Sequence, residues 1–127
     1  MISFPVLAAD QPSRGAVLGK AALRAAERLG LSARQFARVT GLSEPGVSRL
    51  KRGMAGIEEG SKAFELAAML VRLYRSLDAI TGGDEAVARA WISAPNEALG
   101  AIPAEKITSV QGLVDVCTYL DSRRARL

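Results

Sequence analysis

The residues best suited to binding chemistry in this chain are polar or cationic and lie close together in the first half. Guanidinium and ammonium groups bind phosphate oxygens, and arginine can also donate to base edges. Residues 14–52 carry nine basic side chains against two acids, whereas residues 61–127 carry eight of each. This local positive charge predicts an anionic partner such as nucleic acid, although solvated helix faces are often basic too. The candidate contacts are Gln35, Ser43, Ser48, Arg49, Lys51 and Arg52.

The elements that must position these side chains are predicted by the segment LSARQFARVTGLSEPGVSRLKRG, residues 31–53. Ala37 is small enough for two helices to cross closely, and Gly41 can adopt the positive φ of a tight turn. Val47 and Leu50 are spaced to face back onto the preceding helix. The pattern predicts a helix-turn-helix, whose second helix enters the major groove of DNA. An αα-hairpin without a DNA partner is the alternative.

Two serines support these helix boundaries. Ser32 and Ser43 stand just ahead of the two helices, where a hydroxyl can cap exposed backbone N–H groups. On the second helix, we expect Arg49 to contact a base edge, with Lys51 and Arg52 on phosphates. Gln35, early in the first helix, could also reach a phosphate.

Catalytic and metal-binding residues are scarce. The chain has no histidine and a single cysteine, Cys117, which has no imidazole partner and is expected to be a small core residue. Its glycines form no phosphate-loop pattern with a following Lys-Ser or Lys-Thr. We therefore expect no enzyme activity and no cofactor or metal.

The layout is predicted to be all-α. Residues 1–13 are expected to form an arm, residues 14–60 the helix-turn-helix unit, and residues 61–127 a small helical domain that a long helix joins to it. Helices are expected over about 14–29, 61–81, 84–92 and 103–107, with a final helix capped by Ser109. No stretch approaches the roughly 20 apolar residues of a membrane span, and no signal peptide is evident, so we expect a cytoplasmic protein.

A stripe of apolar side chains marks the long helix. Its members, spaced by three and four residues, are Leu66, Leu70, Leu73, Leu77 and Ile80. Such a stripe is first of all core and secondly a dimer seam. We expect a homodimer in which Leu70, Leu73 and Leu77, together with Phe4 and Val6 of the arm, contribute to the seam.

The second half carries a family resemblance. The run contains Ala90-Trp91-Ile92, Pro95-Asn96, Ala98-Leu99-Gly100, Pro103, Ile107 and Gly112-Leu113-Val114, leading into Tyr119-Leu120. This order resembles the toxin-binding domain of the Xre/MbcA/ParS antitoxins, and an upstream helix-turn-helix is that family's usual arrangement. Ala101 departs from the pattern, since the family commonly has a second glycine there. Trp91 can bury a large apolar surface where three short helices meet, and Asn96 suits an Asx-type turn.

The resemblance implies a type II antitoxin that binds a protein toxin and represses its own operon by binding operator DNA. Similarity to the Xre branch implies a RES-domain toxin, an enzyme that degrades NAD. A stand-alone Xre-type transcription regulator is the alternative, and an interaction adaptor that has lost DNA contact is a third. The implied toxin contacts are Asn96, Tyr119, Arg123, Arg124, Arg126 and Leu127. For the C-terminal arginines, a solvated helix cap is the competing interpretation.

Overall fold

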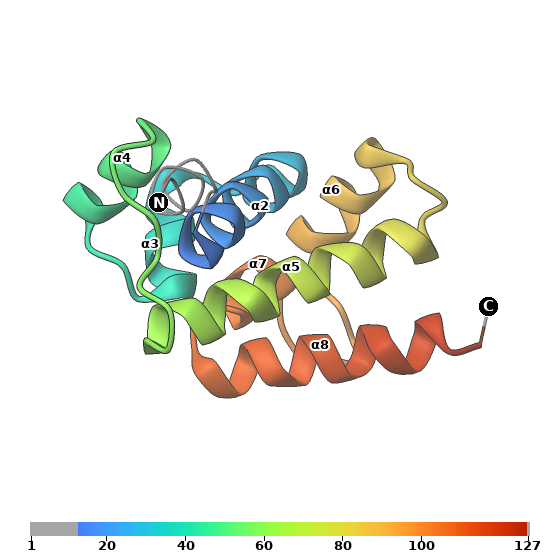
Figure 1. The fold of residues 1–127 in the computed structure, drawn as a ribbon. Helices are drawn as coiled ribbons and strands as arrows, with labels where there is room; N and C mark the ends of the chain where they lie inside the picture. Colours follow the sequence, from blue (N-terminus) through green and yellow to red (C-terminus); the bar gives the residue numbers. More distant parts are fainter. Residues whose placement is uncertain (1–12, 127) are drawn as a thin grey trace, which may run out of the picture.

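The computed structural model describes residues 13–126, which form seven helices and no strand (Figure 1). An isolated bridge between Asn96 and Ala101 is the only β pairing in this range. The all-α prediction is confirmed. The helices are α2 (Arg14–Leu29), α3 (Ala33–Thr40), α4 (Glu44–Lys51), α5 (Lys62–Ile80), α6 (Glu85–Ser93), α7 (Pro103–Lys106) and α8 (Val110–Arg124). No helix among the described residues is long and apolar enough to cross a membrane.

Short polar side chains define where most of these helices begin. At six helix starts, a side-chain oxygen accepts a hydrogen bond from the backbone N–H three residues later, which satisfies a donor that the helix leaves free. The capping residues are Ser13, Ser32, Ser43, Ser61, Asp84 and Ser109. Between α3 and α4, Gly41 adopts φ +80° and its N–H donates to the Ala37 carbonyl at 2.8 Å. The predicted caps and the turn are confirmed.

Helix α5 forms the centre of the molecule, with α2 and α3 packed against it on one side and α8 on another (Figure 1). Leu70, Leu73 and Leu77 are each at most 1% exposed. The predicted seam role of these three leucines is therefore wrong, because neighbouring helices of the same protomer already cover them. Phe4 and Val6 lie outside the described residues.

The second half is joined to the first by backbone contacts at helix ends. The Arg89 side chain on α6 donates to the carbonyl oxygens of Arg28 at 3.0 Å and Glu27 at 2.7 Å, which lie in the last turn of α2. A guanidinium at this position satisfies carbonyls that the helix leaves without intrahelical partners. Further along, the first turn of α8 approaches α7 closely, because a Cβ added at Gly112 would lie 1.8 Å from the Lys106 carbonyl oxygen.

Candidate nucleic-acid and protein interfaces

The orientation of α4 determines which side chains can meet DNA. Val47 and Leu50 are buried, at 2% and 7% exposure, and they hold one side of the helix against the core. Leu50 packs closely against α2 at Gly19, where an added Cβ would lie 2.6 Å from the Leu50 Cδ1 atom. The opposite side is exposed and carries Ser48 and Arg49, with Arg52 following at the end of the helix. These three predicted contacts therefore lie on one outward surface.

Two other predicted contacts already have structural roles. The Ser43 hydroxyl accepts from the Gly46 N–H at 3.1 Å, which leaves its own proton free for a further partner. The Gln35 side-chain carbonyl accepts from the Ser32 N–H at 2.8 Å and completes a capping box at the start of α3. The Gln35 side-chain oxygen is therefore already engaged, whereas its amide N–H groups can still donate to a phosphate.

Lys51 faces a different direction from the two arginines. It is exposed and borders small hollows that it shares with Ala33, in the first turn of α3, and with Glu44. Glu44 lies in the first turn of α4, where the helix dipole favours negative charge. The structure thus places Lys51 beside the start of α3, between the two helices of the motif.

On the other half of the molecule, an aromatic and cationic ladder joins α6 to α8. The rings of Trp91 and Tyr119 stack with centroids 6.3 Å apart and an interplanar angle of 15°. The Arg123 guanidinium lies 5.8 Å from the Tyr119 ring centroid and also donates to the Tyr119 hydroxyl at 3.2 Å. Trp91 is partly buried and packs against the core, so it covers apolar surface as the sequence predicts. Tyr119 on the longer helix α8 supplies part of that contact.

A second polar network ties the end of α8 to α5. Asp121 pairs with Arg72 and accepts from the buried Ser76 hydroxyl at 3.0 Å, and Arg124 donates to the same hydroxyl at 3.5 Å. Arg72, Ser76 and Asp121 were not predicted from the sequence. The only local signal is the four-residue spacing of Arg72 and Ser76 on α5. Of the three tail arginines, Arg123 and Arg124 are thus held on the helices.

The remaining predicted toxin contacts lie in a turn and at the terminus. The Asn96 side-chain oxygen accepts from the Leu99 N–H at 3.1 Å, and the Asn96 backbone N–H donates to the Ala101 carbonyl at 3.0 Å. Asn96 therefore shapes the loop between α6 and α7 through the kind of side-chain turn that the sequence predicts. Arg126 is exposed beyond the end of α8, and Leu127 lies outside the described residues.

Cys117 lies on the side of α8 that faces α5 and is buried. Its thiol lies 3.5 Å from the Met69 carbonyl oxygen of α5. Burial raises the pKa of this thiol to about 11, so it stays protonated near neutral pH. The cysteine is a core residue, as predicted.

The two candidate interfaces are well separated. In Figure 1, α4 lies near the beginning of α5, whereas the C-terminal end of α8 lies near its far end. The outward surface of α4 and the C-terminal end of α8 therefore do not overlap.

An amino-terminal helix-turn-helix on a long central helix, followed by a small helical domain, defines a two-part protein with a DNA-binding type of motif. Comparison with protein families gives a match for residues 8–72 to the antitoxin Xre-like helix-turn-helix domain. Residues 76–126 match the antitoxin Xre/MbcA/ParS C-terminal toxin-binding domain. The chain belongs to the Xre-like antitoxins and is the antitoxin of a toxin–antitoxin pair, which confirms the resemblance. No curated protein matches it significantly.

Proposed function

We propose that this antitoxin neutralises a RES-domain, NAD-degrading toxin by direct contact and represses its own operon by binding operator DNA as a homodimer in the cytoplasm. The observation that carries the DNA half is the outward surface of α4, where Ser48, Arg49 and Arg52 are exposed opposite the buried Val47 and Leu50. A second copy is needed because helix-turn-helix proteins read half-sites about 34–36 Å apart, and one module buries too little surface for strong specific binding.

In this proposal the residues of the helix-turn-helix contact different parts of the DNA. Arg49 contacts a base edge, while Arg52 and Lys51 contact phosphates on either side of it. Ser43 and Ser48 donate hydroxyl protons, and Gln35 donates its amide. The position of Lys51 beside the start of α3 supports a phosphate contact at the point where the two helices meet.

The toxin half of the proposal rests on the end of α8. Trp91 and Tyr119 are partly buried and stack together, the exposed Arg123 lies beside the Tyr119 ring, and Arg126 extends beyond the helix. Together with Asn96 and Leu127, these residues would contact the toxin, with the tail closing the entrance to its active site. Arginines suit a pocket for the NAD pyrophosphate where acids line it, or where the tail simply fills the opening.

The DNA half is tested by Arg49→Ala in a binding titration with the operator of its own gene. We expect a loss of about 1–3 kcal/mol, together with affinity that falls steeply between 50 and 200 mM salt. Arg126→Ala is the matched control, because it removes the same charge at the opposite end of the molecule. Operator affinity that neither Arg49→Ala nor salt alters would contradict the proposal.

The toxin half is tested by deleting residues 122–127 and co-expressing the truncated chain with the protein encoded by the neighbouring gene. Cellular NAD should fall even if the complex still assembles, while operator affinity should remain. The Arg49→Ala variant, which keeps the tail, should protect NAD fully. Full protection by the truncated chain would assign inhibition to residues 91–107 instead. A neighbouring gene product that leaves NAD unchanged and does not bind would favour a stand-alone regulator.

A further inference from the structure

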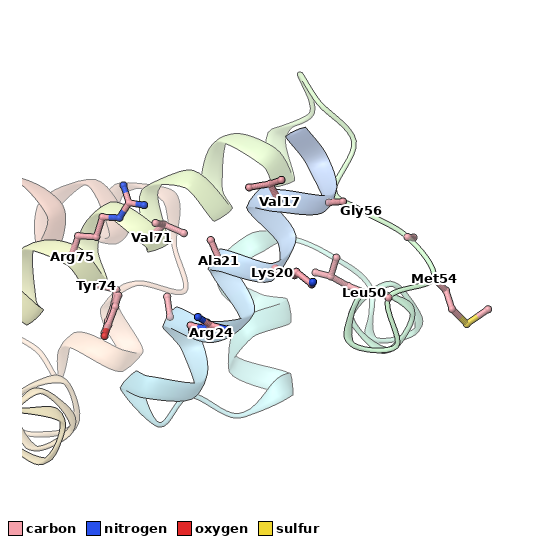
Figure 2. A pocket seen from close by; sticks show the side chains of 14 residues that line it. Val17, Lys20, Ala21, Arg24, Leu50, Met54, Gly56, Val71, Tyr74 and Arg75 are labelled. Carbon is pink, nitrogen blue, oxygen red and sulfur yellow. The ribbon is translucent and has the colours of Figure 1, made fainter. Parts of the chain in front are cut away.

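An apolar groove on the helix-turn-helix half remains without a function. It has a volume of about 820 Å³ and lies between α2, α5 and the connector that leads from α4 to α5, residues 52–61 (Figure 2). No side chain of the described residues fills it. Its apolar lining includes Val17, Ala21, Leu50, Met54, Val71 and Tyr74.

The lip of this groove exposes apolar surface to solvent. Val17 on α2 is 54% exposed and Met54 on the connector is 69% exposed, and they are among the most exposed large apolar side chains of the described residues. Lys20, Arg24 and Arg75 also line the groove, so its edge is cationic. A continuous apolar hollow with a charged rim is typical of a surface that binds another segment of chain.

The connector is a fixed wall of the groove. Its Gly56 lies so close to α2 that an added Cβ would be 2.6 Å from the Ala16 nitrogen. The next residue, Ile57, is buried and donates its N–H to the Gly15 carbonyl at 3.1 Å. The groove is therefore formed before any partner arrives, so an occupant would not have to order the connector.

We propose that residues 2–7 of a second copy of this chain occupy the groove, so that two copies exchange their amino-terminal arms. Five of these six residues are apolar: Ile2, Phe4, Pro5, Val6 and Leu7. The arm also carries one acid, Asp10, and no lysine or arginine, which complements the cationic rim. The sequence of the arm thus fits the groove both in its apolar content and in its charge.

The length of the arm allows this exchange. Twelve residues precede Ser13 and can span about 40 Å when extended. The α2 wall of the groove, from Ala16 to Ala25, is only about 14 Å long at the rise of an α-helix. An arm can therefore cross to a neighbouring copy and still cover the whole groove.

Two features favour the second copy over the arm's own groove. The connector lies over the first turn of α2, where the arm joins, so an arm folding back on itself would have to pass it. Exchange also forms two identical contacts in one dimer, and their buried areas add.

This interface rests on the proposed function, because it would supply the dimer that operator recognition needs. Its test, however, uses neither DNA nor toxin. Phe4→Cys and Met54→Cys are prepared as separate variants with tags of different mass, mixed, and oxidised. We expect a disulfide between the two variants. The native Cys117 is buried and does not compete, and Val87→Cys on α6, 49% exposed, is the control partner that should not link to Phe4→Cys.

Light scattering gives a second measurement on the same question. The intact chain at micromolar concentration should have twice the mass of one chain, and deletion of residues 2–9 should halve it. Val17→Asp, at the lip of the groove, should halve it as well, whereas the matched Val87→Asp should leave the dimer intact. Circular dichroism establishes that each variant is folded.

The proposal is overturned by an intact chain that is monomeric, by a dimer that survives the deletion, or by equal cross-linking at positions 54 and 87. A monomer in which Phe4→Cys and Met54→Cys link only when both are in one chain would overturn it in favour of an arm bound to its own groove. A dimer lost in both the deletion and Val17→Asp supports it, whether or not the protein binds its operator.

Discussion

Replacing Gly112 with alanine should destabilise the second half of the molecule, although alanine is the better helix former. The added Cβ would lie 1.8 Å from the Lys106 carbonyl oxygen, against an ordinary contact of at least 3.4 Å. Helix α8 and the end of α7 must then separate by about 1.6 Å, since a backbone atom cannot rotate away. Overpacking of this kind costs up to about 3 kcal/mol, and helix propensity returns about 1 kcal/mol.

The net loss should therefore be about 2 kcal/mol, which lowers Tm by about 6–10 °C for a chain of this size. Thermal unfolding monitored by circular dichroism measures this change in Tm. Gly46→Ala on α4 is the control, because its added Cβ would meet side-chain atoms only, the Ser43 Oγ at 3.0 Å and the Leu42 Cβ at 4.0 Å, and Tm should change much less. A Gly112→Ala protein with a Tm equal to or above that of the parent would refute the reasoning.

Three further predictions concern the core, the junction of the halves and the cysteine. Leu73→Ala should cost about 3–5 kcal/mol in urea unfolding because the side chain is fully buried, whereas Val114→Ala, 37% exposed, should change stability by less than about 0.5 kcal/mol. Arg89→Ala should lower the free energy of unfolding by about 1 kcal/mol, a modest loss because the Arg89 side chain is half exposed. It should also speed amide exchange in the last turn of α2, and unchanged exchange would argue against the capping role of Arg89. Cys117 should resist alkylation at pH 8 until the protein unfolds. The free energy of unfolding should fall between pH 9 and about 11, because the thiol loses its proton in the unfolded chain but keeps it in the folded one. Cys117→Ala should remove this loss of stability.

Helix boundaries were predictable because their causes are local in sequence. A serine or aspartate accepts from the N–H group three residues later, so Ser32, Ser43, Ser61 and Asp84 could be identified as caps without knowledge of the fold. The turn at Gly41 is local in the same sense. The inward direction of Val47 and Leu50 follows from helical spacing alone, and with it the exposed side of α4.

Contacts between distant segments were not predictable from periodicity. A stripe of leucines on α5 indicates that one face is apolar, but it does not say whether α8 or a second copy covers that face. The Trp91 and Tyr119 stack joins residues 28 positions apart, and the network around Asp121 joins residues 45 or more apart. Nothing in the spacing of these residues distinguishes them from other exposed aromatic or charged side chains. The roles of the site residues on α4 and α8 remain predictions.

The continuity of α5 limits how this protein can change over evolution or in engineering. The two family domains meet within this helix, since one match ends at residue 72 and the other begins at residue 76. An inserted or deleted residue between these points would rotate everything that follows by about 100°, because each residue turns the helix by that angle. Recombination between relatives would therefore have to preserve the helical phase at this junction. Insertions would be tolerated more readily at Gly82 and Gly83, where the helix has ended.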